Sequence, residues 1–265
     1  MKVALVTGVS SGIGQATAEK LAQTGYRTFG TARGDLSPQP GVEVVRIDVR
    51  DRDSVEEGVA HVFERAGRID VLVNSAGTAM ISAAEETSAD EARDLFETNF
   101  FGVMRMTQAV LPAMRAQRSG RIINISSVLG FLPAPFMSTY AATKHAVEGY
   151  SESLDHEVRN FGIRVIVVEP GFTRTNLGRN NGHPERHLAE YDEVRRRVSD
   201  RIRESIERGD DPAIVAKVVL RAATEPAPRL HYTAGREAKL LRFLRTVAPA
   251  ALLDRGVRKS FGVGS

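Results

Sequence analysis

The sequence predicts an α/β fold built on a doubly wound parallel sheet of about seven strands, with helices on both faces. Runs rich in Val and Ile recur along the chain and alternate with helical patterns, as βαβ units require. Several runs are apolar on both of their faces, which suits strands that helices cover on both sides. The first run passes through a glycine-rich turn straight into a helical pattern. Together these observations indicate a Rossmann-type sheet.

We expect the strands, in order, at 3–8, 27–32, 42–49, 69–77, 121–127 and 163–170, with a short seventh at 229–234. A helical pattern follows the first strand and ends at Gly25, and the stretch 138–158 is amphipathic and helical. The range 183–208 predicts a highly charged amphipathic helix, because apolar residues recur there every three or four positions: Leu188, Tyr191, Val194, Val198, Ile202 and Ile206.

The length of 265 residues fits one domain over 1–265, since no linker-like break divides the chain. Within it we expect a substrate lid at 176–210 and a basic amphipathic tail at 236–265. With 42% hydrophobic and 26% charged residues, the composition is that of a soluble globular protein. The absence of cysteine excludes disulfides, thiolate metal sites and a cysteine nucleophile. No signal peptide or membrane-spanning run is expected, so we predict a cytoplasmic protein.

The positive charge is concentrated at the end of the chain. Residues 229–265 carry eight Lys/Arg against two acids, which gives +6 there and −3 elsewhere for a total of +3. A basic amphipathic tail can lie on an anionic membrane, or it can pack over a cleft or a neighbouring subunit, and both interpretations stay open. Nucleic-acid binding has no supporting motif.

The turn after the first strand is the first candidate site. Gly8, Gly12 and Gly14 allow a tight turn and bring backbone N–H groups close to a pyrophosphate at the positive end of a helix, and Ser10 and Ser11 offer hydroxyl donors. A Walker loop is disfavoured because no Gly-Lys-Ser/Thr follows. A glycine-rich turn without a ligand is the alternative.

Arg33, 19 positions after Gly14, is the first charge at the end of the second strand. A guanidinium there favours the 2′-phosphate of NADP(H) by its charge and its bidentate geometry. Asp35, two positions later, keeps NAD(H) as an alternative.

Tyr140 and Lys144 lie one helical turn apart on the same helix face. A free tyrosine has a pKa near ~10. We expect the ammonium, together with the positive ring of an oxidised nicotinamide, to lower that pKa and make the phenol a usable proton donor and acceptor. Taken alone, the pair is also what a half-exposed helix face contains.

Seven short motifs follow one another along the chain: TGVSSGIG, IDV, NSAG, ETNFFG, ISS, YAATK and PGFTRT. Together and in this order they resemble the compact single-domain branch of the short-chain dehydrogenase/reductase family over about residues 3–235. NSAG departs from the common Asn-Asn-Ala-Gly at Ser75. The resemblance implies a catalytic set of Asn99, Ser127, Tyr140 and Lys144. Ser127 orients the substrate oxygen, Lys144 also bonds the nicotinamide ribose, and Asn99 holds a water of the proton relay, although a helical Asn can simply bond local backbone.

The resemblance also implies a cofactor-binding set spread over the strand ends. Asp48 and Val49 flank the adenine in this family, and the Pro170–Gly171 turn passes under the nicotinamide. The whole implied set is Gly8, Ser10, Ser11, Gly12, Ile13, Gly14, Arg33, Asp48, Val49, Asn74, Ala76, Gly77, Tyr140, Lys144, Pro170, Gly171, Thr173 and Thr175.

The segment between Ser127 and Tyr140 is apolar and predicts an apolar substrate cleft, with ordinary core or oligomer contacts as the alternative. Its apolar residues are Leu129, Phe131, Leu132, Phe136 and Met137. The spacing of His183 and His187 could bind metal, but no third ligand is evident, so we predict no metal site. We expect an NADP(H)-dependent oxidoreductase that acts on an apolar, steroid- or retinoid-like alcohol or ketone. The family resemblance also implies a homodimer or a homotetramer. A nonenzymatic dinucleotide-binding sensor or scaffold is the competing hypothesis.

Overall fold

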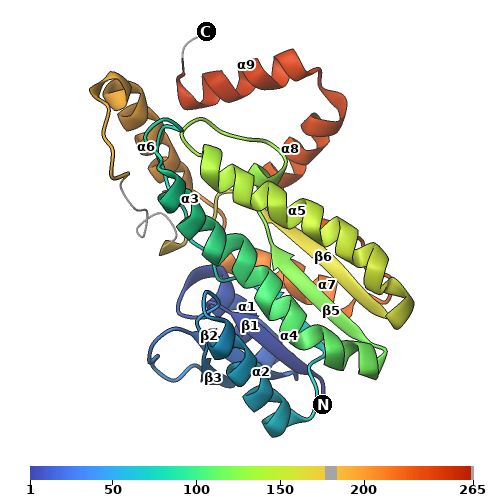
Figure 1. Cartoon of the computed structure of the whole chain (residues 1–265). Helices are drawn as coiled ribbons and strands as arrows, with labels where there is room; N and C mark the ends of the chain where they lie inside the picture. The colour runs from blue at the N-terminus through green and yellow to red at the C-terminus, as the bar shows by residue number, and fades with distance from the viewer. Residues whose placement is uncertain (177–183, 264–265) are drawn as a thin grey trace.

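The computed structural model describes residues 1–176 and 184–263, and its centre is a parallel sheet of seven strands (Figure 1). The strand order is β3-β2-β1-β4-β5-β6-β7, and each neighbouring pair is parallel. The predicted fold class is therefore confirmed. The strands are β1 (Val3–Thr7), β2 (Arg27–Ala32), β3 (Val42–Arg46), β4 (Val71–Asn74), β5 (Gly120–Ile125), β6 (Ile163–Pro170) and β7 (His231–Ala234).

Helices cover both faces of the sheet, and the alternation of side chains along each strand sorts the core into two layers. Val3 and Leu5 of β1 pack on the face that carries α2 (Arg52–Ala66), α4 (Gly102–Gln117) and α5 (Ser138–Val158). Ala4 and Val6 pack on the opposite face, against α1 (Gly12–Gln23) and α7 (Pro212–Thr224). This burial on both faces explains the uninterrupted apolar runs in the sequence.

Shorter helical segments lie near the carboxyl ends of the strands. Between β4 and α4 the chain forms α3 (Ala89–Phe96), which runs without a break into the π-helical turn η1 (Glu97–Phe101). The 3₁₀ turns η2 (Val128–Gly130) and η5 (Ala189–Tyr191) and the helix α6 (Asp192–Glu207) complete the walls around these strand ends. The 3₁₀ turn η3 (Arg159–Phe161) directly precedes β6 and therefore lies at the opposite edge of the sheet.

The helix predicted at 183–208 starts later than its apolar pattern suggests. The α-helix begins at Asp192, after the 3₁₀ turn at 189–191. The backbone N–H of Glu185 donates to the Glu91 side chain, and that of Leu188 donates to Glu86, so both amides bond to carboxylates far away in the sequence. Residue 183 lies outside the described residues. The expected strand at 42–49 likewise ends at Arg46, where its pairing with β2 stops.

The basic tail forms two helices, α8 (Arg236–Val247) and α9 (Ala250–Phe261), which Pro249 separates. Their inner sides contact the rest of the molecule through Leu241 on α8 and Phe261 on α9. The outer side exposes apolar side chains among basic ones, with 55% of Leu240, 62% of Phe243 and 57% of Val247 and of Leu252 exposed. Among the described residues, no helix combines the length and the apolar composition that crossing a membrane requires.

Candidate active site

The glycine turn after β1 packs directly against the segment that follows β4. Gly8 has a φ of +72°, and a Cβ there would come within 2.8 Å of the Ala76 Cα atom. A Cβ on Gly14 would lie 2.2 Å from the Gly8 carbonyl oxygen. Thr7 joins the two segments, because its Oγ1 accepts hydrogen bonds from the Ser75 and Ala76 N–H groups at 2.9 and 3.0 Å. Side chains at the glycine positions would thus block this close approach.

The same turn exposes the N-terminal end of α1. Ser11 is the N-cap residue, but its side chain does not cap the helix, so the N–H groups of the first turn are open to a ligand. Ser10 is exposed, and Ile13 packs against the core. Gly12 faces Thr175, because a Cβ on Gly12 would lie 3.0 Å from the Thr175 Cγ2 atom. The first and the last motif of the predicted cofactor set therefore meet here, and a pyrophosphate fits this cradle.

The predicted adenosine side lies at the ends of β2 and β3. Arg33 follows the last residue of β2 and is exposed, as is Asp35. Asp48 is partly buried and accepts a hydrogen bond from the Arg50 N–H at 3.0 Å, while Val49 is buried against Gly102. The choice between Arg33 and Asp35 as the ribose partner stays a prediction.

Asn74 and Asn99 are both buried behind the segment after β4. The Asn74 Nδ2 donates to the Asn124 Oδ1 at 2.9 Å. Asn99 belongs to the π-helical turn η1. Its Oδ1 accepts a hydrogen bond from the Thr78 N–H and its Nδ2 donates one to the Thr78 carbonyl, each at 2.9 Å. Such π turns inside helices often mark functional sites. The side chain of Asn99 therefore positions backbone, and the water predicted at Asn99 stays a prediction.

The predicted catalytic side chains come together beyond the end of β5. Tyr140 and Lys144, on α5, are 6% and 7% exposed, so they are not a solvent-facing helix pair. The Tyr140 hydroxyl lies next to the Ser127 side chain, close enough for Ser127 to act on its pKa. The Lys144 Nζ donates to the Ile125 carbonyl at 3.0 Å and lies 5.7 Å from the centre of the Tyr140 ring. Gly77 lies beside these side chains, because a Cβ added to Gly77 would be 4.0 Å from the Lys144 Nζ.

Burial controls the pKa values of this pair. It raises the pKa of Tyr140 to about 12, although the neighbouring Ser127 side chain acts in the opposite direction. Burial also lowers the pKa of Lys144 to about 8, and the charge of Glu148 opposes that shift. For the chain by itself, the predicted lowering of the tyrosine pKa is wrong, because desolvation outweighs the effect of Ser127. The contribution expected of an oxidised nicotinamide stays a prediction.

The turn after β6 closes the opposite side of the site. Pro170 ends the strand and is buried, and the Gly171 N–H donates to the Ala234 carbonyl at 3.3 Å. Thr173 is buried, and its Oγ1 donates to the Gly171 carbonyl at 3.1 Å. This hydroxyl stabilises the turn that the family resemblance places under the nicotinamide.

Tyr140 belongs to an apolar cluster in which α5, α6 and the loop before Tyr140 meet. Its buried members are Ala79, Leu95, Ala134, Met137, Tyr140, Val198 and Ile202. Leu129 and Phe136 of the predicted substrate segment pack on this cluster, whereas Phe131 and Leu132 pack in a separate cluster with α8. Phe136 has a φ of +60°, a conformation rare for a bulky residue, and its carbonyl accepts a hydrogen bond from the Ser82 N–H at 2.9 Å.

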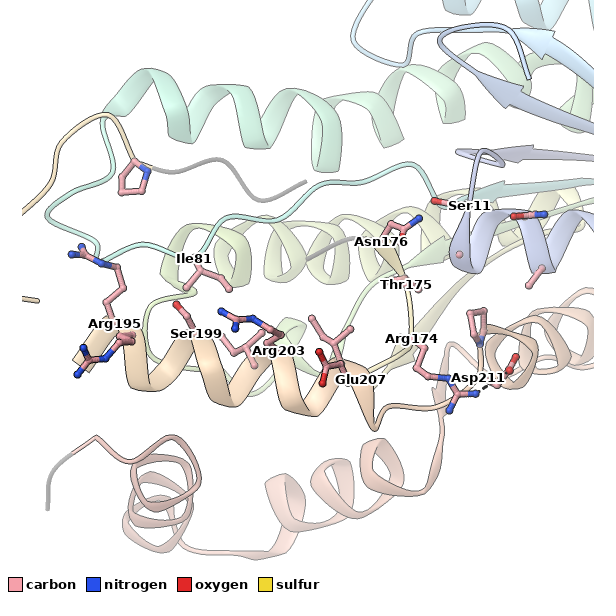
Figure 2. A pocket seen from close by; sticks show the side chains of 18 of the residues that line it. Ser11, Ile81, Arg174, Thr175, Asn176, Arg195, Ser199, Arg203, Glu207 and Asp211 are labelled. Atoms are coloured by element: carbon pink, nitrogen blue, oxygen red, sulfur yellow. Dashed lines mark hydrogen bonds and ion pairs between the residues drawn. The ribbon is translucent and has the colours of Figure 1, made fainter. Parts of the chain in front are cut away.

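A cleft of about 1360 Å³ runs between the start of α1 and α6. Figure 2 shows Ser199, Arg203 and Glu207 projecting from α6 toward the side on which Ser11 and Thr175 lie. Tyr140 is not part of the lining, but the lining residues Ile81 and Ile202 pack in the same apolar cluster as Tyr140. The cleft therefore adjoins both the α1 end and the apolar surroundings of the tyrosine.

Several supporting residues carry no motif in the sequence. The Thr143 Oγ1 accepts from Asn99 and donates to the Tyr140 carbonyl, which connects two residues of the predicted catalytic set. A polar residue on a buried helix face is the one signal that could have indicated it. Of the two histidines whose spacing could bind metal, His187 contacts Asp192 at 2.9 Å, and His183 lies outside the described residues. A different group, Glu148, Glu152 and His231, brings its ligand atoms within 4.8 Å of one another.

Comparisons with known proteins agree with this geometry. A sequence model described as short chain dehydrogenase matches residues 2–186. A 3-ketodihydrosphingosine reductase of Bacteroides thetaiotaomicron is 41% identical over 184 residues, which are 69% of this chain and 68% of the reductase. A crystal structure of a short-chain dehydrogenase from Streptomyces avermitilis has a TM-score of 0.80 and 36% identity over 100% of this chain and 98% of that one. A Burkholderia phymatum short-chain dehydrogenase/reductase in complex with NAD has a TM-score of 0.78 and 26% identity, covering 91% and 92% of the two chains.

Proposed function

This chain belongs to the short-chain dehydrogenase/reductase family of oxidoreductases, and from its site we propose that it interconverts an apolar ketone and a secondary alcohol with NADP(H). The observation that carries the proposal is the buried Tyr140 next to Ser127, with the Lys144 Nζ 5.7 Å from the centre of its ring, inside an apolar cluster. Family membership supplies the oxidoreductase class, whereas the cofactor preference and the substrate class are our inference.

The residues present fit a dinucleotide. Gly8 and Gly14 have no side chains that would keep the pyrophosphate from the backbone, and the first N–H groups of α1 are uncapped, so this turn suits the pyrophosphate. The guanidinium of Arg33 suits a 2′-phosphate. The Gly77 and Pro170–Gly171 segments border the place for the nicotinamide. When bound, the nicotinamide supplies or accepts the hydride.

The chain's own residues then handle the substrate oxygen and its proton. With a pKa of about 12, Tyr140 keeps its proton throughout the neutral range, which suits a proton donor in ketone reduction. Ser127 holds the substrate oxygen next to the phenol. The Lys144 ammonium stabilises the phenolate that remains after Tyr140 has donated its proton.

The apolar cluster supports an apolar substrate. A ketone carried by an alicyclic or alkyl skeleton would contact Met137, Val198 and Ile202, while only its oxygen would need polar partners. The relative named as a 3-ketodihydrosphingosine reductase acts on a ketone by its name, which supports the same reaction class.

The reaction class is tested by following the near-ultraviolet absorbance of NADPH with a panel of apolar ketones. We expect NADPH consumption with at least one ketone, and the reverse reaction with the matching alcohol and NADP⁺. A sensor or scaffold would bind the dinucleotide without consuming it. Dinucleotide binding without turnover across the panel, in either direction, would favour that competing hypothesis.

A further inference from the structure

A group of buried charges lies outside the proposed catalytic set, where α5, β6, β7 and α8 meet. Glu169 at the end of β6 is fully buried, and Glu148 on α5 is 7% exposed. Buried carboxylates are rare unless partners compensate their charge. Each of these two still has one buried oxygen without a hydrogen-bond partner, Oε1 in Glu148 and Oε2 in Glu169. The site described above uses neither of them.

His231 on β7 joins the carboxylates of this group. Its Nδ1 lies 2.9 Å from the Glu169 Oε1 and 3.3 Å from the Glu148 Oε2, and its Nε2 lies 3.2 Å from the Glu152 Oε1. An imidazole that faces carboxylates with both nitrogens donates from both, which requires the protonated ring. A divalent cation would coordinate only one of the two nitrogens, so this geometry fits an imidazolium better than a metal. Hydrogen bonds that the ring donates to Glu148 and Glu169 correspondingly raise the pKa of His231 to about 9.

Glu148 extends from His231 to the segment that contacts Lys144. A Cβ on Gly130 would lie 2.8 Å from the Glu148 Oε1 and 2.5 Å from the Ser126 Oγ, so the carboxylate reaches the turn that follows Ser127. The Lys144 Nζ contacts the same segment at the Ile125 carbonyl. Lys144 and Glu148 are four residues apart on α5, and both are buried on one face of the helix.

We propose that Glu148 is a positioning residue that keeps Lys144 in its ammonium form, and that the His231 imidazolium holds the Glu148 carboxylate in place for this task. The proposal rests on the proposed role of Lys144 in the reaction. Charged groups surround Glu148 from each element packed on it: Lys144 and Glu152 on α5, Glu169 on β6, His231 on β7 and Arg242 on α8. The guanidinium of Arg242 lies 3.3 Å from the Glu169 carboxylate.

The physical reason is the desolvation of the lysine. Burial favours the neutral amine, and Glu148 supplies a negative charge that opposes this effect. The Glu148 Oε1 accepts no hydrogen bond, so no N–H or O–H donor reduces the effect of its negative charge. Neutralising Glu148 therefore lowers the pKa of Lys144, and the lysine loses its proton at a lower pH.

The test measures Lys144 directly by NMR in protein labelled with ¹³C-lysine. The chain contains only six lysines, and the signal missing from a Lys144→Arg variant identifies residue 144. In Glu148→Gln we expect the titration midpoint of Lys144 to fall by at least about 0.5 pH unit. Glu152→Gln is the matched control, because Glu152 contacts the same histidine but is half exposed, and we expect it to give less than half that shift.

Two further variants complete the test. Glu148→Asp keeps the charge and should restore most of the wild-type midpoint, which a loss of packing would not explain. If Glu148→Gln does not fold, Glu148→Met removes the charge with an apolar side chain of similar length and should give the same shift. A Lys144 midpoint equal to wild type in the folded neutral variant would overturn the proposal. Because the titration needs no turnover, this outcome is distinct from a failure of the proposed oxidoreductase function.

Discussion

At the scale of single residues, we propose that Arg33 decides the cofactor preference. It is exposed at the end of β2 and is the first charged residue after that strand. A guanidinium forms paired, charge-assisted hydrogen bonds with a phosphate, and a ribose hydroxyl offers no such partner. One side chain can therefore separate NADP(H) from NAD(H).

Replacing Arg33 by Ala should raise the KM for NADPH by about 10- to 100-fold and leave the KM for NADH nearly unchanged, because one charge-assisted contact is lost. Steady-state kinetics with each cofactor measure both values. Arg52→Ala, which removes an exposed arginine from α2, is the control. An NADPH KM that does not change in Arg33→Ala would assign the preference to another residue, with Asp35 the first to examine.

The catalytic residues show how far single-residue reasoning from the sequence reaches. Spacing placed Tyr140 and Lys144 on one face of a helix, and the structure has them there, next to Ser127. Their burial was not visible in the sequence, because it comes from residues on other elements, such as Val198 on α6. For the chain by itself, that burial raises the Tyr140 pKa, which is opposite to the predicted direction.

At the scale of elements, α6 is held over the site by one buried carboxylate. Glu86 is 1% exposed, pairs with Arg195 of α6 and accepts from the Leu188 N–H at 2.9 Å and the Ala83 N–H at 3.1 Å. Burial alone would raise the pKa of Glu86, but the hydrogen bonds from Arg195, Leu188 and Ala83 outweigh it and lower the pKa to about 2. We expect α6 to act as the substrate lid with Glu86 as its anchor.

Glu86→Gln should loosen α6 while the sheet stays folded. Because α6 is rich in arginine, trypsin measures its opening, and we expect cleavage within 192–207 to become at least about 10-fold faster. Glu85→Gln is the matched control, since Glu85 bonds only the exposed Tyr191 hydroxyl among the contacts described, and it should change the rate little. Equal cleavage rates in the two variants would contradict the anchor role.

The same anchor gives α6 a defined acid sensitivity. The folded pKa of Glu86 is lowered, so its contribution to stability is fully present above the ordinary value of 4.5 and is lost as pH falls toward about 2. In Glu86→Gln, the decline of unfolding free energy over this range should be smaller than in the wild type.

The sequence pattern located most elements, because strands buried on both faces and amphipathic helices leave local signals. The helix predicted at 138–158 coincides with α5, and β2 and β6 have the predicted bounds. The start of α6 was missed, since the amides of Glu185 and Leu188 bond to carboxylates about a hundred residues away. Contacts of that range have no local signature.

At the scale of the whole molecule, the order of the strands gathers residues from distant parts of the chain at one edge of the sheet. Gly8 after β1 meets Ala76 after β4, because these strands are neighbours in the sheet. The tail completes the arrangement, as α8 packs on the turn after Ser127 and α9 packs beside α6. Membrane contact through the exposed side of the tail, the homo-oligomer and the cytoplasmic location stay predictions.

We propose that these features serve one chemical event, the transfer of a proton between Tyr140 and a substrate oxygen. The most direct measurement is the turnover of Tyr140→Phe with NADPH and an active ketone, next to the Tyr150→Phe control. Tyr150 lies on the same helix but packs against Phe100, outside the predicted catalytic set. We predict that Tyr140→Phe loses at least about 100-fold in kcat, with NADPH binding and folding unchanged, while Tyr150→Phe keeps its activity. Wild-type turnover in folded, NADPH-bound Tyr140→Phe would contradict the account.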